Sequence, residues 1–165
     1  MKMLYVVRHA KSSWSNPSLD DFDRPLNRRG KKNAPFMAEI LLKKKILPEV
    51  IIASPANRAF TTAECFAEIL GYLNSRIKAD ENLYEADSLD ILNVISEVED
   101  YINSVMIFGH NPGLTNFVNF ISDGGIENIP TTGVVCLKLN VNTWKDVVRE
   151  SCEILWFDYP KKHTP

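Results

Sequence analysis

The sequence predicts an α/β protein of three layers, α/β/α, with a mostly parallel central sheet and an antiparallel edge hairpin. Apolar, strand-like segments alternate with segments of helical spacing over roughly the first 120 residues, which is typical of a parallel sheet. Two further strand-like segments then follow each other without a helix between them, as a hairpin would. The length of 165 residues suits a single domain over 1–165, with 160–165 expected as a loose C-terminal tail.

The expected strands are short apolar runs rich in β-branched and aromatic residues, as in strands buried on both faces. They lie at residues 4–7, 49–53 and 105–108, with a shorter one at 77–79 and the hairpin at 134–139 and 152–157. The first run ends at Arg8-His9 and the third principal run ends at Gly109-His110. Charged and ionisable side chains therefore stand at strand ends.

Four helices are expected from the spacing of apolar residues and from their capping residues. The first ends before Pro48, the second opens at Ser54-Pro55 and closes at Gly71, the third is capped by Asp87 or Ser88 and runs to about Val98, and the fourth starts at Pro112. Residues 11–25 are polar and carry the acidic group 20–23, so we expect an irregular surface loop there.

Composition excludes several classes of protein. The formal charge of −2 gives no overall basic field for nucleic acid, so an anion site must be a local cluster. No apolar run approaches the ~20 residues of a membrane helix, and the N-terminal run is too short for a signal peptide, so a cytoplasmic protein is expected. Cys65, Cys136 and Cys152 are expected as buried reduced thiols.

The strand ends bring two arginines and two histidines toward one edge of the sheet, where α/β proteins bind ligands. Arg8 and His9 follow the first strand, Arg58 stands in the first turn after the second, and His110 follows the strand at 105–108. Guanidinium groups hold phosphoryl oxygens in bidentate fashion, and a neutral imidazole can attack phosphorus. This pattern predicts an anion site with His9 as nucleophile, although Arg58 could instead pair with Glu64 or Glu68 on its helix.

Several motifs in order resemble the histidine phosphatase superfamily, the phosphoglycerate mutase-like proteins, and within it the short SixA-type phosphohistidine phosphatases. The motifs are Arg8-His9-Ala10, Arg24-Pro25-Leu26-Asn27 with Gly30, Ser54-Pro55 with Arg58 and Thr62-Ala63, Leu83-Tyr84-Glu85-Ala86, and Gly109-His110-Asn111-Pro112-Gly113. They cover the chain from about residue 3 to residue 121.

The resemblance implies that His9 is the phosphorylated residue, that Arg8 and Arg58 bind phosphate, and that His110 is the second histidine of the phosphate pocket. Glu85 lies where the broader superfamily carries an acid that protonates the leaving oxygen; an ester needs such an acid more than a leaving imidazole does. Asn111 is a weaker candidate for phosphate binding.

The expected activity is a metal-independent, cofactor-free phosphatase that passes the phosphoryl group through His9, with phosphohistidine on a protein partner as substrate. Its alternatives are a phosphatase for small phosphate monoesters that uses Glu85 as acid, a phosphoglycerate-type mutase, and a binding module for phosphate or phosphohistidine without turnover. His163 is expected to be exposed in the tail, and the histidine spacing predicts no metal site. The acidic segment 20–23 suggests a contact with a basic partner surface.

Overall fold

The protein is described over residues 1–164 by a computed structural model, whose centre is a six-stranded sheet in the order β3-β2-β4-β1-β5-β6. The strands are β1 (Lys2–Arg8), β2 (Val50–Ala53), β3 (Lys78–Ala79), β4 (Ser104–Gly109), β5 (Val134–Leu139) and β6 (Cys152–Asp158). The helices are α1 (Arg28–Lys43), α2 (Asn57–Leu70), α3 (Ser88–Ser96) and α4 (Gly113–Ile121). Each expected strand and helix is present, with boundaries shifted by a few residues.

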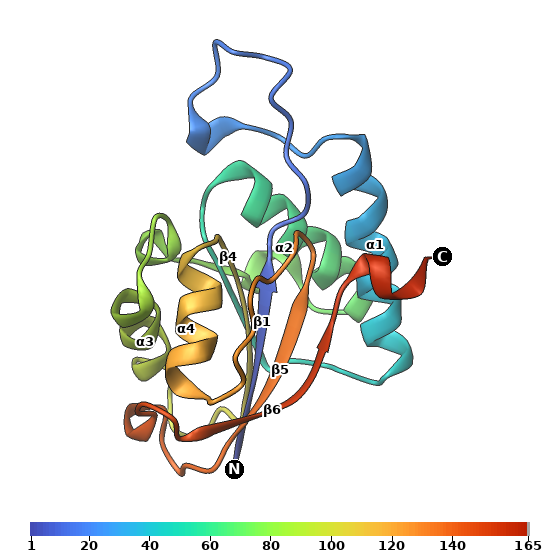
Figure 1. Ribbon diagram of the computed structural model, residues 1–165. Helices are drawn as coiled ribbons and strands as arrows, with labels where there is room; N and C mark the ends of the chain where they lie inside the picture. Colours follow the sequence, from blue (N-terminus) through green and yellow to red (C-terminus); the bar gives the residue numbers. More distant parts are fainter. Residues whose placement is uncertain (165) are drawn as a thin grey trace.

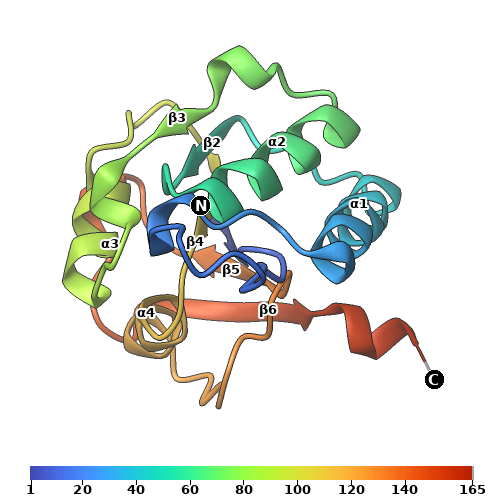
Figure 2. The same ribbon diagram turned by 90° about the horizontal axis from the view of Figure 1, so that it is seen from above.

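Strand β1 lies inside the sheet, parallel to β4 and antiparallel to β5. Strands β2, β3 and β4 are also parallel to one another, and β5 and β6 form the antiparallel hairpin that ends the sheet. Helices α1 and α2 cover one face, and α3 and α4 cover the other (Figures 1 and 2). The predicted three-layer fold is thus confirmed.

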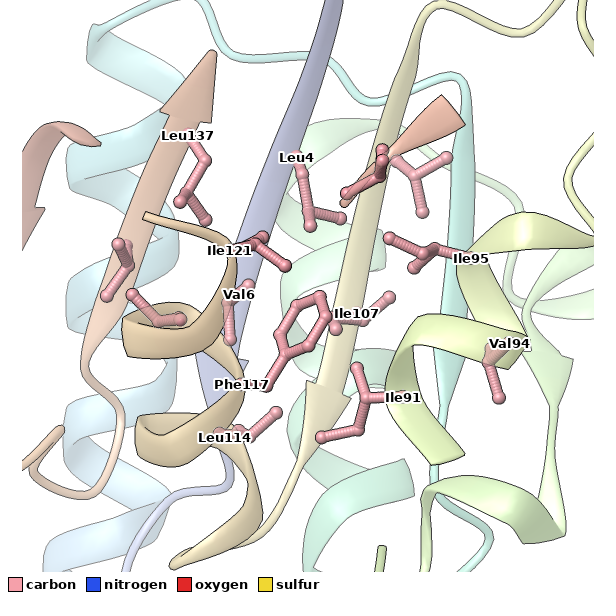
Figure 3. Close-up of a cluster of buried hydrophobic side chains, with 14 of the residues drawn as sticks. Leu4, Val6, Ile91, Val94, Ile95, Ile107, Leu114, Phe117, Ile121 and Leu137 are labelled. Atoms are coloured by element: carbon pink, nitrogen blue, oxygen red, sulfur yellow. The ribbon is translucent and has the colours of Figure 1, made fainter. Parts of the chain in front are cut away.

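The two faces of β1 belong to two separate hydrophobic cores, because successive side chains of a strand point to opposite faces. Leu4 and Val6 pack under α3 and α4, where Phe117 fills the space between α4 and the sheet (Figure 3). Tyr5 and Val7 pack under α1 and α2. Burial on both faces leaves β1 little freedom, and the strand ends directly at His9.

The C-terminal residues are more ordered than the expected loose tail. Pro160–His163 form a 3-10 helix beside α1 (Figure 1), and the His163 Nε2 lies 2.7 Å from a carboxylate oxygen of Asp158. The His163 ring also meets the ring of Phe36 on α1 edge-on, at 5.8 Å between centroids. A hydrogen bond and an aromatic contact therefore hold this segment, which a sequence rich in lysine and proline did not indicate. Pro165 lies outside the described residues.

All three cysteines are free, as expected. Cys136 and Cys152 are buried, and burial raises the pKa of Cys136 to about 12, which keeps it a thiol. Cys65 differs from the prediction, because it is only half-buried on α2.

Candidate active site

The carboxyl ends of β1, β2 and β4 meet at one edge of the sheet, below the loop of residues 11–25 (Figure 1). A pocket of about 220 Å³ opens there, and we call it the strand-end pocket. Its lining residues are Arg8, His9, Lys11, Ser12, Trp14, Arg24, Arg58, His110, Asn111 and Thr131. The four arginines and histidines predicted from the strand ends are therefore brought together.

His9 is buried and its ring is held in one orientation. The Nδ1 atom lies 2.7 Å from the carbonyl oxygen of Ala10, which can only accept a hydrogen bond, so Nδ1 carries the proton. Burial is the main cause that lowers the pKa of His9 to about 4, with the positive charges of Arg58 and Arg8 contributing and the Ala10 bond opposing the shift. The imidazole is consequently neutral near pH 7, with an unshared electron pair on Nε2.

The backbone around His9 is fixed by two neighbouring elements. The His9 amide donates to the carbonyl of Gly109 at the end of β4, at 3.1 Å. The Ala10 amide donates to the Thr62 hydroxyl at 3.0 Å, and that hydroxyl donates to the carbonyl of Arg58 one turn earlier on α2, at 2.7 Å. Thr62 thus links the backbone of His9 and Ala10 to that of Arg58. In the sequence, only the Thr62-Ala63 motif had pointed to this residue.

His110 lies next to His9, with 5.2 Å between the ring centroids. Its Nε2 is 2.8 Å from the hydroxyl of the fully buried Ser54, which also accepts the amide of Ala56 at 3.3 Å. The Nδ1 atom of His110 is buried and has no partner among residues 1–164. Burial, followed by the proximity of His9 and Arg58, lowers the pKa of His110 to about 3.

Arg8 and Arg58 supply positive charge at the pocket wall. Arg8 donates from Nη1 to the carbonyl of Ile129 at 3.0 Å, which fixes the plane of its guanidinium. The Nε atoms of both arginines are buried and have no acceptor among the described residues. Guanidinium groups suit phosphoryl oxygens, because they can hold them through paired, charge-assisted hydrogen bonds.

Asp21 is a site residue that the sequence did not single out. Its carboxylate accepts from Arg58 Nη2 at 2.9 Å and from Arg24 Nη2 at 3.0 Å, and the hydroxyl of Tyr84 donates to it at 2.7 Å. Partial burial alone would raise the pKa of Asp21, but the hydrogen bonds from Tyr84, Arg58 and Arg24 hold that pKa well below its usual range. The carboxylate therefore stays ionised.

This contact corrects two interpretations of the sequence. Arg58 pairs with Asp21, across 37 positions of the chain, and not with Glu64 or Glu68 on its own helix. The acidic loop also turns the carboxylate of Asp21 toward the protein's own arginines, while its contact with a basic partner stays a prediction. No periodic pattern in an irregular loop could have indicated this pairing.

Arg24 lines the strand-end pocket, although the sequence-based assignment of site residues did not include it. Its Nη1 donates to the hydroxyl of Ser12 at 2.7 Å, and its guanidinium lies 3.5 Å from the centroid of the Trp14 ring. The Trp14 side chain is 74% exposed, so this cation–π contact stands at the mouth of the strand-end pocket.

The structure does not bring Glu85 into the strand-end pocket. Glu85 is exposed, has a left-handed backbone with φ of 53°, and is not among the lining residues. The side chain of its neighbour Tyr84 lies close to the site instead, with 5.5 Å between the ring centroids of Tyr84 and His110. The hydrogen bond to Asp21 and partial burial raise the pKa of Tyr84 to about 12, so Tyr84 remains a hydrogen-bond donor.

Asn111 lines the pocket, but its amide is already bonded within the protein. The Nδ2 group donates to the carbonyl of Ile129 at 2.9 Å, and Oδ1 accepts from the amide and the hydroxyl of Thr115. Asn111 thus connects the start of α4 to the segment that also fixes Arg8.

Residues 1–164 hold neither a cluster of metal-binding side chains nor a membrane-spanning helix. No three histidine, cysteine, aspartate or glutamate side chains gather in the arrangement that a metal ion requires. Among the helices of this part of the chain, none combines the length and the apolar character needed to span a bilayer.

A neutral, oriented histidine beside a second histidine and two arginines, at the strand ends of a doubly covered sheet, defines a site for phosphoryl groups. Comparison with known sequences then places the protein: it belongs to the histidine phosphatase superfamily (branch 1), whose sequence profile matches residues 4–104.

Individual relatives agree with this membership. An uncharacterized chloroplastic protein of Arabidopsis thaliana is 29% identical over 153 residues, which are 88% of this chain and 70% of that protein. The structure of a putative phosphohistidine phosphatase SixA from Agrobacterium tumefaciens superposes with a TM-score of 0.81 at 25% identity, over 96% of this chain and 98% of that one.

A SixA protein histidine phosphatase complexed with tungstate has the same fold, with a TM-score of 0.79 at 21% identity over 97% and 98% of the two chains. Family membership and these structures together support phosphatase activity.

Proposed function

We propose that the protein is a metal-independent phosphatase that forms a covalent phosphohistidine on His9 and acts on phosphohistidine carried by a protein partner. The observation that carries the proposal is the hydrogen bond from His9 Nδ1 to the Ala10 carbonyl, at 2.7 Å. This bond leaves Nε2 unprotonated inside a pocket that also holds Arg8, Arg58 and His110. A nucleophile held in the required tautomer among phosphate ligands is what covalent phosphoryl transfer demands.

In the first step, the electron pair of His9 Nε2 forms a bond to phosphorus while the bond from phosphorus to the leaving nitrogen breaks. The guanidinium groups of Arg8 and Arg58 and the imidazole of His110 stabilise the charge on the equatorial oxygens. The leaving imidazole nitrogen takes a proton from solvent, and His9 carries the phosphoryl group.

In the second step, water attacks the same phosphorus and the bond to His9 Nε2 breaks, which releases inorganic phosphate. The proton that water loses passes to the phosphate or to solvent. The electron pair returns to Nε2, and the bond to Ala10 keeps the ring in the tautomer required for the next cycle.

The choice of phosphohistidine over a phosphate ester rests on the absence of an acid at the pocket. The lining residues within the described chain include no carboxylic acid, and Glu85 lies outside them. Asp21 reaches Arg58 but is held ionised, so it cannot donate a proton. A leaving imidazole needs less help from an acid than a leaving alkoxide does. Similarity to the SixA phosphohistidine phosphatases supports the same substrate class.

The test is to supply a protein-borne phosphohistidine and, separately, para-nitrophenyl phosphate, both in the presence of chelator. We expect turnover to survive chelation and to fall at least about a thousandfold in His9→Ala, because the nucleophile is lost. His163→Ala is the matched control, since this histidine lies outside the strand-end pocket, and it should retain wild-type turnover. Acid-labile phosphate on wild-type protein after rapid quenching should be missing from His9→Ala.

Glu85→Gln tests whether Glu85 acts as an acid on either substrate. We expect wild-type turnover of both substrates in this variant, because Glu85 does not line the pocket. A loss confined to para-nitrophenyl phosphate would make Glu85 the acid for esters. Equal losses on both substrates would contradict the proposed role of the leaving group. If the wild-type protein binds phosphate but turns over neither substrate, it is a phosphoryl-binding module and the proposal fails.

A further inference from the structure

A second and larger hollow lies beside the strand-end pocket, with a volume of about 800 Å³. We call it the basic groove. One wall is the first turns of α1, the second is the segment before β5, and the third is the C-terminal 3-10 helix and the residues next to it. Its lining residues are Arg28, Arg29, Lys32, Asn33, Pro130, Thr131, Tyr159, Pro160, Lys161 and Thr164.

The basic groove adjoins the strand-end pocket, because Thr131 lines both. The next residue, Thr132, donates its amide to the carbonyls of Arg8 and His9, at 3.1 Å each. One wall of the groove is thereby attached to the strand end that carries the proposed nucleophile. A ligand could occupy the groove and present a phosphoryl group to His9.

The wall made by α1 is attached to the same part of the chain. The Asn27 amide donates to the carbonyl of Lys11 at 3.0 Å, and Gly30 lies so close that a Cβ there would overlap the Lys11 carbonyl oxygen. The cations at the start of α1 therefore keep a fixed position relative to His9, two residues before Lys11.

The groove is cationic although the chain as a whole carries a formal charge of −2. Its lining has four cations, Arg28, Arg29, Lys32 and Lys161, and no carboxylate. Over residues 1–164 none of the four forms an ion pair. Cations near a helix N-terminus are disfavoured by the helix dipole, so those at the start of α1 do not stabilise their own helix.

Between the cations the groove offers an apolar surface from Pro130, Tyr159 and Pro160. Such a surface suits the aliphatic parts of side chains, while cations on separate elements suit several negative charges spaced along a chain. The volume is in the range that accommodates a sizeable ligand, and far exceeds the strand-end pocket.

We propose that the basic groove binds an acidic segment of the phosphorylated protein partner, which flanks the phosphohistidine delivered to His9. The inference rests on the proposed function for the identity of the delivered group. Charge complementarity between the groove and the acidic segment then selects the partner. The bound segment also directs the phosphoryl group into the strand-end pocket.

The test measures binding without requiring turnover, using a fluorescently labelled glutamate-rich peptide and the His9→Ala protein at low salt. Anisotropy titrations compare the parent with the charge-reversal variant Arg28→Glu/Lys32→Glu. Lys31→Glu is the matched control, because Lys31 is exposed on the same turn of α1 but does not line the groove. Glutamate suits the start of a helix, so all variants should fold, which circular dichroism checks.

We expect the double variant to bind the peptide at least tenfold more weakly, the control to stay within about threefold of the parent, and rising salt to weaken parental binding. A second comparison uses proteins that retain His9 and two substrates, an acidic phosphohistidine protein and para-nitrophenyl phosphate. The ratio of turnover on the first substrate to turnover on the second should fall at least tenfold in the double variant. Equal peptide affinity in parent and double variant overturns the proposal.

Tighter binding of a short polyphosphate than of the peptide would also overturn it, in favour of a small polyanion as occupant. Failure of this inference is distinguishable from failure of the proposed function. Phosphohistidine turnover without peptide binding rejects the groove alone. Peptide binding without turnover supports the groove and rejects the phosphatase.

Discussion

Acidification from pH 7 to pH 5 should destabilise the fold through His9. The ordinary histidine pKa of about 6.5 describes the unfolded chain, whereas burial lowers the pKa of His9 to about 4 in the folded protein. As the pH falls through this window, the unfolded state binds a proton that the folded state does not, so folding stability falls with pH. Linkage between these two pKa values gives a loss of about 2 kcal/mol between pH 7 and pH 5.

Urea unfolding at the two pH values measures this loss in the wild type and in His9→Asn. Asparagine cannot titrate here and keeps an amide that can donate to the Ala10 carbonyl. The wild type should lose about 2 kcal/mol more than the variant over the same interval. Equal losses would refute the depressed pKa of His9, and with it the argument that the imidazole is fully neutral near pH 7.

Three further substitutions test contacts around the site. Ser54→Ala removes the hydroxyl that holds the His110 ring through Nε2, so kcat on phosphohistidine should fall about tenfold with KM little changed in steady-state kinetics. Gly30→Ala places a methyl group against the Lys11 carbonyl and should lower the free energy of unfolding by about 1–3 kcal/mol. Thr62→Val leaves the Ala10 amide without its acceptor and should cost about 1–3 kcal/mol in urea unfolding, whereas Thr62→Ser should retain most of the stability. A wild-type value for any of the three would contradict the contact concerned.

The parts of the site at strand ends could be predicted from sequence. Arg8, His9 and His110 each follow an apolar run, and parallel strands end at a common edge, so their convergence depends only on the fold class. Arg58 was predictable for a related reason, because it stands in the first turn of the helix after β2. Periodicity was sufficient for these positions.

The parts of the site in irregular segments could not be predicted. Asp21 reaches Arg58 through a loop whose path follows from side-chain contacts such as that of Arg24 with Ser12, and polar loop residues carry no periodic signal. The place of Glu85 depended on one backbone torsion, a φ of 53°, which turns Tyr84 inward and leaves Glu85 exposed. The acceptor of the His9 proton is a main-chain carbonyl, and side-chain identity gives no information about it.

The ion pair of Asp21 with Arg58 has a consequence for turnover. An arginine that binds the substrate's phosphoryl group also binds the product phosphate, and slow product release limits many enzymes. Asp21 presents a carboxylate to that arginine, so under the proposed function this carboxylate and the phosphoryl group would compete for Arg58. The competition would weaken the binding of free phosphate. The loop above the sheet would thus favour release of the product over its retention.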